Sequence, residues 1–209
     1  GGIFLNMIMN MKIQQGFGDR LNLFFNPICS DHGNAIGAAL EEYYQQTGKN
    51  PVPPYMSLYL GSSYSDEEIL LSTKKFNFKV SKVNKVDTAI DLIERGKVIG
   101  WFQGRSEFGQ RGLGSRSILA LPTEQKYRDI VNEKVKKREP WRPFCPTIIE
   151  EKSSEFLKDP LYAPYMILGF EMKNPEQYPA VTHIDRTCRP QILKKDVNPD
   201  FYQVVKGLN

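Results

Sequence analysis

The stretch Val98-Ile-Gly-Trp-Phe-Gln-Gly-Arg-Ser-Glu-Phe-Gly-Gln-Arg-Gly-Leu-Gly-Ser-Arg-Ser-Ile-Leu119 runs from a short apolar segment into a loop of glycines and arginines. Residues 98–102 have the pattern of a buried strand. Glycine lets the backbone approach a ligand closely, and guanidinium groups bind phosphate or carboxylate through two hydrogen bonds. The spacing matches no standard nucleotide loop. We therefore predict an anion cradle after a buried strand, with a flexible loop carrying solvated arginines as the competing interpretation. The arginines concerned are Arg105, Arg111 and Arg116.

The segments before this loop alternate between helix and strand patterns, which indicates an α/β domain. Ser65 and Glu68 form a capping-box pattern that predicts the start of a helix. Residues 76–80 have a strand pattern. Asp87 is predicted to cap the next helix, which Gly96 ends.

The segments after the loop continue the same alternation. One helix is predicted from Thr123 to the stop at Pro140, strands are predicted at 144–149 and 166–172, and Asn198 begins a last helix. The apolar stripe of the first of these helices consists of Tyr127, Ile130, Val131 and Val135.

The amino-terminal block has a different organisation. Strands are predicted at 3–8 and 21–25, followed by a helix from about residue 34 to 46 that stops at Gly48. A proline-rich stretch then has the composition of a linker. We divide the chain into a first block at 1–47, a linker at 48–63 and a second block at 64–209. Because the chain lacks an initiator methionine and opens inside a predicted strand, we expect it to be part of a longer protein.

Composition limits the class of protein. The 209 residues are 40% hydrophobic and 25% charged, which is typical of a soluble globular domain. A net charge of +4 is too small to favour a nucleic-acid partner by itself. Three widely spaced cysteines form no CxxC pair and favour a reducing, cytoplasmic location. No apolar run approaches the roughly 20 residues that a membrane helix needs.

A second basic cluster occupies residues 132–144. Val135 is predicted to face the core, so Lys134 and Lys136 lie on the flanks of the helix. Arg142 stands between two prolines that hold the backbone rigid, which suits a positioned ligand contact. The alternative is a solvated basic face that complements the helix dipole.

Two further segments carry polar side chains suited to chemistry. His183, Asp185, Thr187 and Arg189 alternate, which predicts that they share one face of an extended segment. Residues 31–34, Asp-His-Gly-Asn, stand where a helix begins, and helix capping is their simplest interpretation.

Together these segments resemble the carboxyl-terminal part of the O-carbamoyltransferase family of nodulation-factor and antibiotic biosynthesis. Residues 104–120, 132–146, 163–166 and 181–191 are similar to its hallmark motifs in order and spacing. The first block is similar to the end of an actin/Hsp70-type ATPase domain. The resemblance implies an α/β chain in which a remnant of that ATPase-like domain precedes a YrdC-like domain with an open twisted sheet, truncated at the carboxyl end.

The family chemistry implies two steps and two kinds of partner. Carbamoyl phosphate and ATP are joined as carbamoyl adenylate, and the carbamoyl group then passes to the hydroxyl of a small-molecule acceptor. Magnesium is expected with the ATP phosphates. Iron, or another divalent metal, is expected only in the intact protein, because the two histidines that accompany Asp31 in the family are absent here.

The resemblance also assigns residues to the site. Catalytic roles fall on Arg111, Lys136, Arg142 and His183, nucleotide contacts in the first block on Gly2, Asn6 and Gly33, and metal binding on Asp31. The residues expected to bind carbamoyl phosphate or ATP are Arg105, Arg111, Arg116, Ser117, Asn132, Lys136, Arg142, Thr187 and Arg189.

Five positions depart from the family pattern without removing a charged ligand. They are Gln110, Gly112, Cys145, Arg186 and Cys188, where the family has Pro, Ala, Ala, Gly and Ala. One rival interpretation is a basic module that binds RNA or nucleotide without catalysis. Another is a silent regulatory domain that keeps the nucleotide site. The RNA contacts would be Lys134, Lys136, Lys137 and Arg138.

Overall fold

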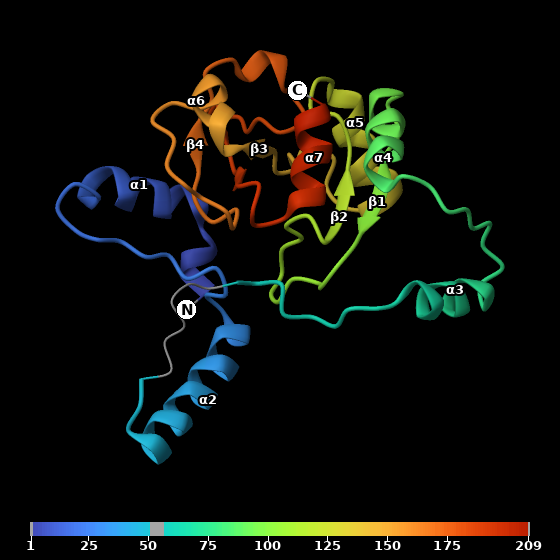
Figure 1. Ribbon diagram of the computed structural model, residues 1–209. Coiled ribbons are helices and arrows are strands. Elements are labelled where there is room, and N and C mark those ends of the chain that lie inside the picture. Colours follow the sequence, from blue (N-terminus) through green and yellow to red (C-terminus); the bar gives the residue numbers. More distant parts are fainter. Residues whose placement is uncertain (1, 51–56, 209) are drawn as a thin grey trace.

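Three short strand pairs form the framework of the computed structural model, which describes residues 2–50 and 57–208 (Figure 1). β1 (Ile99–Phe102) and β2 (Arg116–Leu119) are antiparallel, with Trp101 opposite Ser117. β3 (Thr147–Ile149) runs parallel to β6 (Gln191–Leu193), and β4 (Phe170–Glu171) runs antiparallel to β5 (Thr187–Cys188). The α/β class is confirmed. Within the described residues the strands form three separate two-stranded sheets, and the open twisted sheet implied by the resemblance stays a prediction.

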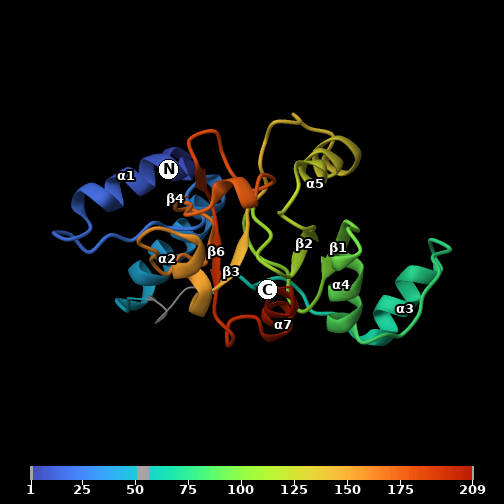
Figure 2. The same ribbon diagram turned by 90° about the horizontal axis from the view of Figure 1, so that it is seen from above.

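Two helices cover the β1–β2 hairpin and β3. These are α4 (Lys85–Glu94) and α7 (Pro199–Gly207), which pack on each other beside the strands (Figure 2). Asn198 caps α7 as predicted, since its Oδ1 accepts from the Phe201 N–H. α4 is capped by Asn84 and not by Asp87, which lies inside the first turn. The shared core contains Ala89, Ile93, Trp101, Ile149, Leu193, Phe201, Tyr202 and Val204.

A second core lies around β4 and β5. The short helices η3 (Glu150–Lys152), α6 (Ser153–Phe156) and η4 (Pro175–Gln177) surround it. Its buried members are Ile148, Leu157, Ala163, Leu168, Phe170, Met172, Val181, Cys188 and Ile192. The strand predicted at 166–172 is therefore confined to β4, and the one at 144–149 to β3.

The first block contains no strand at either of the two places where one was predicted. The prediction at 3–8 is wrong, because this segment forms the 3₁₀ helix η1 (Gly2–Leu5) and the start of α1 (Met7–Phe17). Asn6 caps α1 by accepting a hydrogen bond from the Met9 N–H at 3.1 Å. The strand predicted at 21–25 is also wrong, since that stretch has no regular structure. Both errors have one physical reason: a strand needs a hydrogen-bonded neighbour.

The helix predicted near residues 34–46 is confirmed as α2 (Asp31–Thr47), which begins three residues earlier. Its stop at Gly48 is confirmed, with φ of 64°. Part of the predicted linker, residues 51–56, lies outside the described residues.

The capping box at Ser65 and Glu68 is confirmed at the start of α3 (Asp66–Lys74). The strand predicted at 76–80 is wrong, because no neighbouring strand pairs with it among the described residues. Phe76 and Phe78 instead stack on each other, with ring centroids 5.8 Å apart. α3 and this stretch lie away from the rest of the second block (Figures 1 and 2).

The helix predicted from Thr123 to Pro140 divides into α5 (Gln125–Asp129) and the π-helix η2 (Ile130–Lys136). Tyr127 and Val131 are buried as predicted, but Val135 is 46% exposed, which contradicts its placement in the core. The wider turn of a π-helix rotates later residues away from the face that earlier ones share. Among the described residues, no helix is both long enough and apolar enough to cross a membrane.

Candidate anion site

The glycine-rich loop is held together by Glu107 and Arg116. The Glu107 side chain is fully buried, and its Oε1 accepts from the backbone N–H groups of Leu113 at 2.6 Å and Ser115 at 2.7 Å. Arg116 donates to the carbonyl oxygens of Glu107, Gly109 and Arg111. The guanidinium of Arg116, predicted to bind ligand, is thus directed at the loop's own backbone.

Two carbonyl oxygens at the end of the loop anchor it to the rest of the molecule. That of Leu113 accepts from Tyr59 Oη and Gln191 Nε2, both at 2.9 Å. That of Gly114 accepts from Trp101 Nε1 at 2.8 Å, and the Gly114 N–H donates to the hydroxyl of Ser117 at 3.0 Å. Gln103 and Asn198 also donate to the Gly114 oxygen. Hydrogen bonds from five side chains therefore anchor the carboxyl end of the loop, which argues against the flexible-loop interpretation.

Arg111 and Arg189 meet beside Cys145. The Nε atoms of both arginines are buried, and neither forms a hydrogen bond among the described residues. Burial lowers the pKa of Arg111, and the positive charge of Arg189 lowers it further. Burying a guanidinium without a partner is costly unless an anion compensates it. The arrangement therefore has the physical properties of an anion site.

The thiol of Cys145 is affected by four nearby cations. Burial raises the pKa of this thiol, against the lowering effect of Arg111, Arg189, Arg138 and Lys136. Lys136 is largely exposed, and its partial burial lowers the pKa of its ammonium group, with a further contribution from Arg138. Cations from the loop, from η2 and from the segment after β5 thus act on one thiol.

The side chain of Arg142 is on the rim of this group. It is exposed, and its Nε lies 3.6 Å from the Oε2 of Glu139. Its charge nevertheless acts on Arg138. Arg105 is exposed as well, with its Nε donating to the Gly61 carbonyl at 2.7 Å. These two arginines are therefore less enclosed than Arg111 and Arg189.

His183 begins a turn, so the prediction of an extended segment from His183 to Arg189 is wrong. The Arg186 N–H donates to the His183 carbonyl at 2.9 Å, and Arg186 has φ of 63°. Asp185 accepts from the N–H and the hydroxyl of Thr187, and these bonds hold the turn. His183 still lies near Arg189: burial lowers the pKa of the imidazole, and the charge of Arg189 lowers it further.

The predicted residues of the first block lie elsewhere. Asp31 is exposed at the first position of α2, while Ser30 is the cap residue, so the capping role predicted for residues 31–34 does not fall on the Asp31 side chain. Gly33 lines a cavity of about 300 Å³. Asn6 is used as the cap of α1, and Gly2 lies in η1. No group of three metal-ligating side chains occurs among the described residues.

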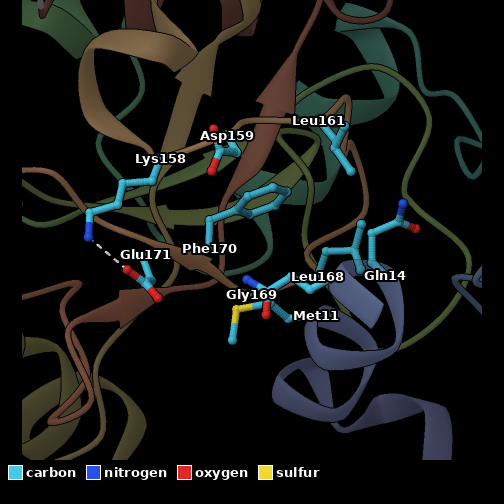
Figure 3. Close-up of a pocket in the computed structure, with 10 residues that line it drawn as sticks. Met11, Gln14, Lys158, Asp159, Leu161, Leu168, Gly169, Phe170 and Glu171 are labelled. Atoms are coloured by element: carbon cyan, nitrogen blue, oxygen red, sulfur yellow. Dashed lines mark hydrogen bonds and ion pairs between the residues drawn. The ribbon is translucent and has the colours of Figure 1, made fainter. Parts of the chain in front are cut away.

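Two other cavities in the molecule differ from the anion site in the charges that line them. The one in Figure 3, about 150 Å³ between α1 and β4, has its cation Lys158 paired with Glu171 at 2.8 Å and offers no free charge to an anion. A larger apolar cavity of about 400 Å³ lies between the end of β2 and residues 144–148, beside α7. Cys145 lines this cavity and also faces the cation cluster.

The site contains residues that sequence reasoning missed. Glu107, Gln191 and Cys145 were not assigned to it, and Arg138 was considered only as an RNA contact. A single carboxylate inside a glycine- and arginine-rich loop was an available signal for Glu107, because a buried cation needs a counter-charge. Gln191 is the last residue of the hallmark motif at 181–191, but the motif gave no indication that its side chain contacts the loop.

The buried, unpartnered Nε atoms of Arg111 and Arg189 in an α/β chain are features that suit the binding of an anion. The family model described as "Carbamoyltransferase C-terminus" matches residues 90–209, more than half of the chain. The chain therefore belongs to the carbamoyltransferase family, a class of group-transferring enzymes.

Several curated proteins are similar over nearly the whole chain. Nodulation protein NolO of Bradyrhizobium diazoefficiens is 34% identical over 99% of this chain and 39% of its own length. The 3'-hydroxymethylcephem-O-carbamoyltransferase of Amycolatopsis lactamdurans is 30% identical over 99% of this chain and 38% of its own length. An uncharacterized protein of Methanocaldococcus jannaschii is 33% identical over 99% of this chain and 35% of its own length. The chain thus spans well under half the length of these relatives.

Proposed function

We propose that this chain forms the part of an O-carbamoyltransferase that binds carbamoyl phosphate and ATP. Water removes the phosphate of carbamoyl phosphate as inorganic phosphate, and the carbamate that remains displaces pyrophosphate from ATP to give carbamoyl adenylate. The carbamoyl group then passes to a hydroxyl of a small-molecule acceptor with release of AMP. The observation that carries the proposal is the pair of buried, unpartnered Nε atoms of Arg111 and Arg189 beside Lys136. Membership of the family supports the reaction type.

The residues act by positioning and charge neutralisation. Arg111, Arg189 and Lys136 hold the phosphate groups, and they offset the charge that builds up when two anions are brought together. Arg142, on the rim, and His183, next to Arg189, are the other two residues of the proposed site. The apolar cavity next to Cys145 has the size and lining suited to the base of a nucleotide. No covalent enzyme intermediate is required.

The finer domain assignment is part of this proposal. Residues 64–209 are a YrdC-like activating domain, and residues 1–47 are the end of an ATPase-like domain, joined by the linker at 48–63. The family match from residue 90 to 209 supports the second block.

Metals enter the proposal in two ways. Magnesium accompanies ATP through the nucleotide's own phosphates, which requires few protein ligands. Iron does not fit the described residues by themselves: Asp31 is exposed, and its neighbour His32 has its Nδ1 3.3 Å from the Ser30 hydroxyl. One carboxylate is a poor site for iron.

The direct test is calorimetry of the intact protein with carbamoyl phosphate and a non-hydrolysable ATP analogue. Arg111→Ala should weaken binding of carbamoyl phosphate by about tenfold to a hundredfold, the range for losing a hydrogen-bonded charge. The matched control is Arg95→Ala, an exposed arginine at the carboxyl-terminal cap of α4 that pairs with Asp91. Equal binding by the wild type and Arg111→Ala would remove the pocket from the mechanism.

A further inference from the structure

Residues 57–61, at the end of the predicted linker, lie along the glycine-rich loop, and we call them the strap. Tyr59 forms an antiparallel bridge with Glu107, the buried carboxylate of the loop. The Phe108 N–H donates to the Leu58 carbonyl at 2.6 Å. The strap therefore pairs with the loop through its backbone, as a neighbouring strand would.

The end of the strap is fixed by Gly61. Its N–H donates to the Ser106 carbonyl at 2.9 Å, and its own carbonyl accepts from the Arg105 Nε at 2.7 Å. A Cβ at Gly61 would lie 2.9 Å from both the Cβ and the carbonyl oxygen of Ser106. The strap and the loop therefore approach each other so closely that this position suits a residue without a side chain.

The side chain of Tyr59 connects the strap to the part of the loop that carries Arg111. Its Oη donates at 2.9 Å to the carbonyl of Leu113, which follows Arg111 by two positions. Burial raises the pKa of Tyr59 above its usual value of about 10, so the hydroxyl keeps its proton and donates at neutral pH. Leu113 is itself buried, in the same apolar cluster as Leu58 of the strap. A hydrogen bond and shared apolar packing thus join the strap to the loop beside Arg111.

The first block also contacts this loop. Ile28 belongs to the apolar cluster around Leu113, and a Cβ at Gly109 would lie 3.2 Å from the Ile28 Cγ2. The rings of His32 and Phe108 meet edge to face, with centroids 6.1 Å apart. These contacts and those of the strap come from residues before position 90, where the family match begins. The position of the loop therefore depends on residues that the match does not include.

We propose that the strap is a positioning element of the anion site, and that Tyr59 is the positioning residue that directs the guanidinium of Arg111 at a bound phosphate group. Tyr59 does not have to touch the ligand. The assignment rests on the proposed function, because it takes the phosphate of carbamoyl phosphate as the ligand. A binding group that is displaced from its productive geometry loses much of its effect, so the support of Arg111 should be measurable as affinity.

The test measures the Kd of carbamoyl phosphate for the intact protein by calorimetry. Tyr59→Phe removes one hydrogen bond and keeps the ring, so it should weaken binding by about threefold to tenfold. The Leu113 carbonyl still accepts from Gln191 in this variant, so the buried oxygen keeps a donor. Tyr64→Phe, which changes an exposed tyrosine just after the strap, is the matched control and should bind as the wild type does. Equal binding by Tyr59→Phe and the wild type would overturn the role of Tyr59.

A double-mutant cycle separates positioning from structural support. If Tyr59 acts through Arg111, Tyr59→Phe should weaken binding in the wild type but add little when Arg111 is already alanine. Loss of stability alone would lower the urea midpoint and leave the Kd of the folded protein unchanged. A full additional loss in the double mutant would overturn the positioning role. Inorganic phosphate, titrated in parallel, should rank the variants in the same order.

Gly61→Ala tests the strap by an independent route. The added methyl group displaces the strap from Ser106 while the Tyr59 hydroxyl is still present, and it should weaken binding at least as much as Tyr59→Phe does. Gly37→Ala, where a Cβ meets nothing within 4 Å, is the control. If Gly61→Ala binds as the wild type does, the loop keeps its position without the strap and the proposal is overturned.

Failure of this proposal and failure of the proposed function give different results. If Arg111→Ala weakens binding and Tyr59→Phe does not, the positioning role is overturned while the proposed function stands. If Arg111→Ala binds as the wild type does, the proposed function fails and the positioning role fails with it. Circular dichroism of each variant detects loss of the fold. Should Gly61→Ala lose its fold, Tyr59→Phe, the smaller change, decides.

Discussion

The Nε of Arg116 lies 3.4 Å from the Oε2 of Glu107, a carboxylate whose side chain is completely buried. Glu107 thereby links the two ends of the glycine-rich loop, since its other oxygen accepts from Leu113 and Ser115. The direction of Arg111, which lies between these ends, depends on this pair. The pair belongs to the support of the site and does not have to touch the ligand.

We expect Glu107→Ala to destabilise the intact protein strongly. The change leaves two buried N–H groups without an acceptor and Arg116 without its counter-charge, which together cost about 3–5 kcal/mol of unfolding free energy. Urea unfolding measures this loss. Glu107→Gln keeps an oxygen acceptor and should lose clearly less. A Glu107→Ala variant as stable as the wild type would show that the loop is held by other contacts.

We expect Gly114→Ala to disrupt both the loop and α7. Gly114 has φ of 103°, and a Cβ there would lie 2.1 Å from Cδ1 of the Phe201 ring. The clash and the backbone strain together should lower the unfolding free energy by at least about 2 kcal/mol. Thermal unfolding measures the shift.

The matched control is Gly37→Ala in the interior of α2, where a Cβ would meet nothing within 4 Å. That variant should gain up to about 1 kcal/mol, because alanine is the better helix former. A comparable loss in both variants would contradict the steric explanation.

The helix ends that depend on hydrogen bonds between residues close together in the chain were predicted correctly from the sequence. The capping box of Ser65 and Glu68, the stop at Gly48 and the start at Asn198 all involve bonds within a few positions along the chain. The wrong strands at 3–8, 21–25 and 76–80 have apolar composition but no partner, and pairing is a property of the whole fold.

Part of the candidate site could be predicted from the sequence, because its basic residues stand in distinctive local motifs. Arg111, Lys136 and Arg189 were expected to converge, and the structure brings them around Cys145. Arg138 was not distinguished from the neighbouring lysines, because a basic run at the end of a helix looks alike at each position. The buried amide of Asn132 is what makes Arg138 different, and its burial is visible only in three dimensions.

We expect His183 to respond to the charge of Arg189. The pKa of His183 is lowered from about 6.5, first by burial and then by Arg189. When the pH falls below about 6.5, His183 takes up a proton in the unfolded chain but not in the folded protein. The unfolding free energy therefore decreases as the pH falls, until the pH passes the lower pKa of the folded state. Arg189→Met should raise the pKa of His183.

NMR titration of the imidazole signals measures this effect, and the chain has only two histidines to assign. His32, on α2, is the internal control. Saturating inorganic phosphate should also raise the pKa of His183, because an anion beside Arg189 offsets its charge. An unchanged titration of His183 in Arg189→Met would show that burial alone sets the shift.

We expect Cys145→Asp to block the site from within. The new carboxylate would stand where four cations act, and it would satisfy them in place of a bound phosphate. Binding of carbamoyl phosphate should therefore weaken by at least about tenfold, the cost of placing like charges together. Calorimetry measures the loss. Cys145→Ala is the control: it leaves the cations unpaired and should bind carbamoyl phosphate as the wild type does. Tight binding by Cys145→Asp would mean that the ligand lies away from Cys145.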